Sequence, residues 1–328
     1  MIRFTKKWAS RIAPLAIALS TMAPLIARAQ SFPDRNIRVV VPAAAGGALD
    51  LISRILSQKA SEILKQQVYV DNKPGANWII GMDTVARAAP DGYTLLFIAS
   101  SGLTINPYVF ANMPLEPMRD LRPVIAVTNT PYVLLANSKL PVRSVKDFIT
   151  YVQENSGKLN HASNSSSTML VSELFKSQAK LEYTDINYKG ASQAMNDTMA
   201  GATQFCFVDL GSGSSAIQGG MLKALGLTSS KGYPLAPDIP PIAESGLPGF
   251  SVESRTLVFA PAKTSDAIVD RLNVAFQAAL DSPEVRDRLR SMGQVTLSEA
   301  PRATLANLEA EAAQWKQLIS DRNIHFEQ

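Results

Sequence analysis

The sequence predicts an α/β protein of two lobes, each a sheet flanked by helices. Short apolar runs typical of buried strands alternate with segments whose apolar residues recur at helical spacing. This alternation is interrupted by turn-forming residues at 129–131 and then begins again. A late strand, residues 252–259, leads back toward the first set. We therefore expect residues 30–129 and 253–328 to form the first lobe and residues 130–252 the second.

The first 29 residues have the pattern of a secretory signal peptide. A basic start precedes an apolar stretch at residues 12–26, and Ala27-Arg28-Ala29 matches a cleavage site of the A-x-A type. No cysteine stands directly after this site, which argues against a lipid anchor there, and no later segment is apolar and long enough to span a bilayer. We expect export to the periplasm with cleavage after Ala29.

Removal of the signal peptide changes the charge balance of the chain. The full sequence has 32 basic and 28 acidic residues; five of the basic residues and none of the acidic ones lie in the first 29, so 27 basic and 28 acidic residues remain. This balance gives no support to nucleic-acid binding. Cys206 is the only cysteine, so no internal disulfide can form, and its apolar neighbours indicate a small core residue.

A strand, a glycine loop and a helix open the first lobe. Residues 37–41 are typical of a buried strand, residues 43–47 are small, and a helix follows to residue 64 with Asp50 in its first turn. Glycine lets a ligand approach the backbone, and a helix start favours an anion by roughly 0.3–2 kcal/mol. This predicts a carboxylate or phosphate site that needs a second surface. The alternative is an ordinary strand-to-helix turn, and no nucleotide-binding motif is present.

The other elements of the first lobe follow in order. We expect a strand at residues 67–70, a turn at 72–75, a helix at 79–86, and a strand at 93–99 that ends in Ser100 and Ser101. A further strand covers residues 122–127, breaks at 129–131 and resumes at 132–136. Late in the chain, helices are predicted at residues 265–280, from 283, and at 302–321.

Each parallel strand of the second lobe is followed by small polar residues. Strands are predicted at residues 159–162, 185–188, 204–208 and 222–228, with helices beginning at Ser144 and Thr168. The polar residues are the loop 163–167, Lys189-Gly190 and the segment after Asp209. In open α/β sheets ligands bind at the carboxyl ends of the strands, so this edge is the predicted second surface. Residues 229–249, rich in Pro and Gly, are expected to be irregular.

Five short motifs occur in order along the mature chain. They lie at residues 41–50 (VPAAAGGALD), 72–76 (NKPGA), 89–95 (APDGYTL), 187–190 (NYKG) and 242–250 (IAESGLPGF). With these motifs behind a signal peptide, the chain resembles the solute-binding receptors of tripartite tricarboxylate transporters, the Bug family, over residues 31–328.

The resemblance implies a two-lobed periplasmic binding protein, type II-like, whose cleft closes on a small carboxylate without catalysis, cofactor or metal. It implies delivery to the membrane subunits of a tripartite transporter; the alternative partner is a periplasmic sensor domain. We expect a monomer. The predicted ligand contacts on the two lobes are Ala43, Ala45, Gly46, Gly47, Asp50, Trp78, Ser100, Ser101, Ser163, Asn164, Ser165, Ser166, Thr168, Lys189 and Asp209.

Four side chains near the predicted cleft leave alternatives open. Trp78 stands where the family usually has glycine, and it either faces an aromatic acid or packs in the core. Lys189 either meets an anion or is a solvated turn residue, and Asp209 holds either a ligand amine or the following backbone amides. His161 either serves as a base beside the serine loop or ends its strand, and no Gly-x-Ser-x-Gly motif accompanies it.

Overall fold

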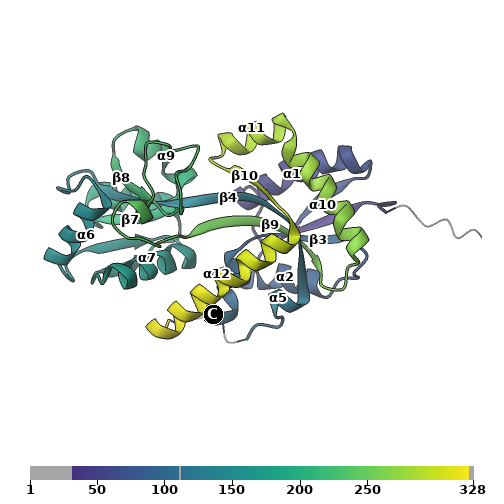
Figure 1. Cartoon of the computed structure of the whole chain (residues 1–328), viewed down its shortest axis with the longest axis horizontal. Helices are drawn as coiled ribbons and strands as arrows, with labels where there is room; N and C mark the ends of the chain where they lie inside the picture. The colour runs from purple at the N-terminus through teal and green to yellow at the C-terminus, as the bar shows by residue number, and fades with distance from the viewer. Residues whose placement is uncertain (1–31, 111, 325–328) are drawn as a thin grey trace, which may run out of the picture.

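The structure is a computed structural model that describes residues 32–110 and 112–324. The predicted signal peptide and His325 lie outside these residues. Figure 1 shows two lobes side by side along the long axis of the molecule, each with helices around a sheet, and two long strands that run from one lobe into the other. The predicted two-lobed α/β fold is confirmed.

Three parallel strands build the first-lobe sheet: β1 (Ile37–Val41), β2 (Val68–Asn72) and β3 (Thr94–Ala99). β1 lies between the other two, with Val39 opposite both Val70 and Leu95. Helices pack on both faces of this sheet, which is why β1 and β3 are apolar along most of their length. The helices of this lobe are α1 (Ala48–Leu64), α2 (Ile79–Ala86), α10 (Asp266–Asp281), α11 (Pro283–Ser291) and the shorter η1 (Ala76–Trp78), α3 (Ser101–Thr104), α4 (Asn106–Val109) and α5 (Pro117–Asp120).

The second-lobe sheet has β5 (Asn160–Ser163) between β6 (Thr184–Asn187) and β7 (Phe205–Asp209), parallel to both. Its core is aromatic: Phe148 packs edge-on against Phe205, and Phe175 against Phe207. β8 (Leu222–Leu227) lies at one side. The helices are α6 (Val145–Glu154), α7 (Ser166–Ala179), α8 (Ala191–Ala200) and α9 (Leu210–Gln218).

Two strands connect the lobes: β4 (Leu121–Asn137) and β9 (Glu253–Pro261). The predicted break at residues 129–131 is wrong, because β4 is one continuous strand of 17 residues. Thr130 and Pro131 pair with Ser254 and Glu253 of β9, and proline's fixed φ suits an extended chain. The break was predicted at the point where β4 changes partners: it pairs with β9 up to residue 131 and with β7 and β8 from residue 132.

The long helix α12 (Pro301–Arg322) crosses from the first lobe to the second, as Figure 1 shows in yellow. Near its start Leu308 belongs to an apolar cluster with Leu103 and Phe259, whereas Trp315 and Leu318 belong to a cluster built largely from the second lobe. At its end, Arg322 Nε lies 3.2 Å from Glu173 Oε2 of α7. α12 therefore contacts both lobes.

The short strand β10 (Val295–Glu299), which pairs antiparallel with β4, was not predicted from the sequence. The segment after β8 is largely irregular, as predicted, with one 3-10 turn, η2 (Ile242–Glu244). Within residues 32–110 and 112–324, no helix combines the length and apolar character needed to cross a membrane.

Candidate functional site

Strand direction brings the predicted ligand-binding loops face to face. β3 runs antiparallel to β9, and β9 antiparallel to β4, so β3 points the same way as β4, toward the second lobe. β7 runs antiparallel to β4 and points toward the first lobe. The carboxyl ends of the parallel strands in the two lobes therefore face each other. The loops after β1 and β3 lie on one side, and the loops after β5, β6 and β7 on the other.

The separation of the two edges close to the connecting strands follows from their register. Ser100 N donates to Arg255 O, and Arg255 pairs with Asn129 of β4. On the other side, Asp209 pairs with Tyr132 of the same strand. Three residue steps along β4 amount to roughly 10 Å at about 3.3 Å each. That distance suits a small organic molecule between the two edges.

The loop at residues 43–47 gives the first lobe an uncapped helix start. Gly47 is the N-cap of α1 and has no side chain to satisfy the first-turn amides. Residues 44–48 are exposed, and Gly46 has a φ of +85° that favours glycine. An ideal Cβ on Gly47 would meet only Ala44 O, at 3.6 Å, so the backbone is open to an incoming group.

Asp50 holds this loop in shape with its buried carboxylate. One oxygen accepts from Gly46 N at 2.9 Å and from Arg54 Nε at 3.0 Å, and the other accepts from Asn72 Nδ2 at 2.9 Å. Asn72 Nδ2 also donates to Ala43 O at 3.0 Å. Burial raises the pKa of Asp50, but these hydrogen bonds and the Arg54 charge outweigh it and leave the pKa below its usual value. Asp50 thus organises the loop through Gly46, Arg54 and Asn72.

Ser165 of the serine loop and Thr168 in the first turn together cap the start of α7. Ser165 Oγ accepts from Thr168 N at 3.2 Å, and Thr168 Oγ1 accepts from Ser165 N at 3.0 Å, which is a capping box. Ser163 Oγ donates to Ser165 O, and Asn164 Nδ2 donates to Phe207 O. The amides of the first two helical residues have no intrahelical acceptor and stay open to a ligand.

Two more helices of the second lobe begin at this edge. α8 starts at Gly190, which has no capping side chain, directly after the exposed Lys189. α9 starts at the half-buried Asp209, whose carboxylate makes no capping bond within the described part of the chain. Burial raises the pKa of Asp209. The helix starts and Lys189 favour an anion, whereas Asp209 opposes one near β7.

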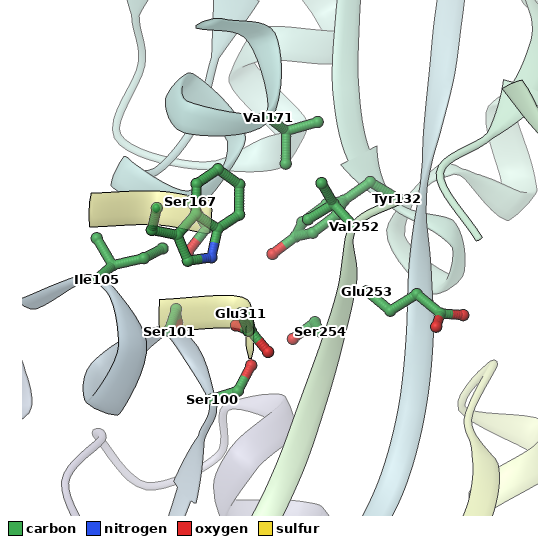
Figure 2. A pocket seen from close by; sticks show the side chains of 11 residues that line it. Ser100, Ser101, Ile105, Tyr132, Ser167, Val171, Val252, Glu253, Ser254 and Glu311 are labelled. Carbon is green, nitrogen blue, oxygen red and sulfur yellow. The ribbon is translucent and has the colours of Figure 1, made fainter. Parts of the chain in front are cut away.

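A small pocket lies where the lobes meet (Figure 2). Figure 2 shows the Tyr132 hydroxyl, Ser100, Ser254 and the Glu311 carboxylate turned toward one space, whereas Glu253 points away. The lining comes from both lobes, from both connecting strands and from α12: Ser100, Ser101, Ile105, Tyr132, Ser167, Val171, Val252, Glu253, Ser254, Glu311 and Trp315. Of the predicted ligand contacts, Ser100 and Ser101 line this pocket; the others lie outside its lining.

Glu311, the half-buried acid of this pocket, was not predicted from the sequence. Its carboxylate accepts from Thr104 Oγ1 at 2.8 Å and from Arg255 Nη1 at 3.2 Å. Burial raises the pKa of Glu311, and the Thr104 hydroxyl and the Arg255 charge only partly offset this. A signal was present: Glu311 lies at helical spacing from Leu308 and Trp315, so it interrupts the buried stripe of α12.

A sequence comparison decides the family. The family model described as the tripartite tricarboxylate transporter family receptor matches residues 52–324. The chain belongs to this receptor family. A UPF0065 protein of Pseudomonas sp. strain P51 is 36% identical over 320 residues, which cover 97% of this chain and 95% of that protein.

Solved structures of similar chains agree with this receptor fold. The periplasmic binding protein BugD is 30% identical, with a TM-score of 0.73 over 90% of this chain and 100% of its own. Rpa4515 of R. palustris, solved with adipate, is 30% identical, with a TM-score of 0.76 over 90% of this chain and 99% of its own. MatC from Rhodopseudomonas palustris, with bound malate, is 30% identical, with a TM-score of 0.73 over 88% and 100%.

This receptor is a solute-binding protein and not an enzyme. The contacts of His161 are those of a residue that stabilises the second-lobe core. His161 is fully buried, its Nδ1 lies 2.6 Å from Asp185 Oδ1, and its Nε2 accepts from Phe207 N at 3.2 Å. Trp78 is half-buried and packs against an apolar cluster of the first lobe. An ideal Cβ on Gly102 would lie 2.9 Å from its ring, so packing accounts for much of the indole surface.

Proposed function

We propose that this receptor captures a small carboxylate between its lobes. The observation that carries the proposal is the pair of helix starts at Gly47 and Gly190, which have no side-chain caps and lie on facing edges of the two sheets. Their unpaired amides favour an anion, and the exposed Lys189 adds positive charge on one side. The adipate complex of Rpa4515 and the malate complex of MatC support an acid as the guest.

We propose further that the predicted lobes, residues 30–129 with 253–328 and residues 130–252, close about the point where β4 changes partners. A ligand that contacts both edges stabilises the closed state relative to the open one. In keeping with the family, the closed receptor delivers its solute to the membrane subunits of a tripartite transporter from the periplasm. This delivery is tested by measuring how the receptor binds the detergent-solubilised membrane subunits with and without solute. We expect binding to depend on solute, and equal binding in both conditions would contradict the proposal.

A thermal-shift screen of mono-, di- and tricarboxylates tests the binding itself. A ligand present at 100 times its dissociation constant stabilises the folded protein by about 2.7 kcal/mol. Gly47→Val should abolish the shift without unfolding the free protein, because its Cβ has room but its branches shield the first-turn amides of α1. A shift that survives this change would exclude the loop from the site.

Gly232→Val is the matched control. Gly232 is exposed in the irregular segment after β8, and an ideal Cβ there meets nothing within 4 Å. This variant should keep the full ligand-induced shift. If both variants lose the shift equally, the effect of Gly47→Val is not specific to the α1 start.

A further inference from the structure

The pocket where the lobes meet has room for one small polar group. Its open space is about 10 Å³, which is close to the smallest volume that holds a water molecule. A hydroxyl or an ammonium group is of that size, whereas a carboxylate has two oxygens on a planar carbon. Because Ser100, Ser167 and Ser254 come from the first lobe, the second lobe and a connecting strand, a group bound there contacts all three.

Glu311 gives this pocket a half-buried hydrogen-bond acceptor. One carboxylate oxygen accepts from Thr104 Oγ1 and the other from Arg255 Nη1. Each carboxylate oxygen has two lone pairs, so capacity remains for a donor from a solute. Burial raises the pKa of Glu311 and the Arg255 guanidinium partly offsets this rise; in its charged form Glu311 repels a second carboxylate placed beside it.

Trp315 gives the same pocket an unused donor. Its side chain lines the pocket and is 2% exposed. Its Nε1 meets no described acceptor in good hydrogen-bond geometry, but it lies near enough to Glu311 to lower the pKa of that carboxyl. An indole N–H can only donate a hydrogen bond, so it needs an acceptor. A group that accepts a hydrogen bond at this point therefore pairs with the Trp315 donor.

A hydroxyl matches both features, since it donates to Glu311 and accepts from Trp315. An ammonium group can only donate, and a carbonyl can only accept. We propose that this pocket binds a hydroxyl group of the solute, so that the receptor selects hydroxy acids over their parent acids. This inference rests on the proposed carboxylate binding. Ser167 lies in the first turn of α7, so a carboxylate held by the open amides of that turn has its hydroxyl within reach of the pocket.

Pairs of acids that differ by one group test the proposal by titration calorimetry on the mature chain. The pairs are propionate with lactate and succinate with malate, and alanine and aspartate replace the hydroxyl by an ammonium group. In each pair that binds, we expect the hydroxy acid to bind about tenfold more tightly than its parent. The ammonium analogue should gain less, because it leaves Trp315 Nε1 unpaired.

Ser254→Val fills the pocket and tests its position. Valine suits a strand such as β9, and its extra carbon enters a space of about 10 Å³. The hydroxy acid should lose its advantage, with an affinity ratio near one, while the parent acid keeps its affinity. Ser251→Val is the control, since Ser251 lies three residues earlier and outside this pocket. The melting temperature of each free variant confirms that it folds.

The outcomes separate this inference from the proposed function. Equal affinity for hydroxy and parent acids would leave carboxylate binding intact and overturn the hydroxyl site. A preference that survives Ser254→Val would also overturn it, because the hydroxyl would then bind elsewhere. If no acid of any pair binds, the proposed function fails and the hydroxyl site falls with it.

Discussion

At the scale of single residues, the carboxylate side chains Asp50 and Glu311 have different structural roles, and the sequence alone does not distinguish them. Asp50 was predicted as a ligand contact from its place in the first turn of α1. Its carboxylate accepts hydrogen bonds from Gly46, Arg54 and Asn72. Asp50 therefore affects ligand binding by fixing the conformation of the loop at residues 43–47. Glu311 was not predicted, because α12 carries three acids, Glu309, Glu311 and Asp321, and only the packing shows which one turns inward.

Replacing Asp50 by Asn should destabilise the free protein by about 1–3 kcal/mol, because the Arg54 guanidinium loses its charged acceptor and Gly46 N loses an oxygen. Urea denaturation of both proteins measures this. Asp287→Asn, a change of the same kind at an exposed position on α11, should lie within about 0.5 kcal/mol of the parent. A stable Asp50→Asn protein with unchanged solute affinity would contradict the assigned role.

At the scale of elements, a charged network joins β5, β6 and α7. Asp185 of β6 accepts from Lys176 Nζ at 2.8 Å and lies 2.6 Å from His161 Nδ1. Lys176 also donates to Glu173, which pairs with Arg322 of α12. Burial raises the pKa of Asp185, but its hydrogen bonds with His161 and Lys176 and the Lys176 charge outweigh this and lower the pKa to about 2.

This network predicts an acid-sensitive stability. Because the folded pKa of Asp185 lies below its unfolded value of 3.8, its contribution is present above about pH 4 and is lost as the pH falls toward 2. That contribution is about 2 kcal/mol. Asp185→Asn should therefore be less stable than the parent at pH 7, and the gap should narrow between pH 4 and 2. Urea melts across this range measure it, and a gap that widens on acidification would refute it.

Prediction from the sequence succeeded for the parallel strands and failed at the connections between lobes. β1, β3 and β7 carry long apolar runs because both faces are covered, so each was predicted within a residue or two. The continuity of β4 through Pro131 depends on pairing with β9, more than a hundred residues later, and no local pattern reports that. The pocket at the lobe junction could not be predicted for the same reason. Ser100, Tyr132 and Glu311 are far apart in the sequence, and only the tertiary fold brings them together.

At the scale of the whole molecule, the lobes approach closely on the side opposite α12. Gly211 at the start of α9 faces the turn before β10, and an ideal Cβ there would lie 2.9 Å from Met292 O. Tyr233 of the second lobe donates to Asn129 O at 2.9 Å at the same junction. A side chain at residue 211 would therefore hold the lobes apart.

Gly211→Ala should weaken solute affinity several-fold without lowering the stability of the free protein. Within a helix the same change normally stabilises by up to about 1 kcal/mol, so a loss of affinity would reflect the contact with Met292. Titration with whichever acid stabilises the parent measures this. Gly213→Ala is the control, two residues later on the same helix. Gly213 faces side chains of the second lobe, so this variant should bind the solute with the affinity of the parent protein. Equal affinity of Gly211→Ala and the parent would show that closure does not bring these backbones together.

The central claim is that backbone amides on facing sheet edges hold the carboxylate of a solute. A crystal structure of the receptor grown with its most strongly stabilising carboxylate tests it most directly. The account predicts carboxylate oxygens within hydrogen-bond distance of first-turn amides of α1 and of a second-lobe helix, α7 or α8, with the lobes closed around them. A carboxylate bound away from residues 45–48, or held by one lobe alone, would contradict it.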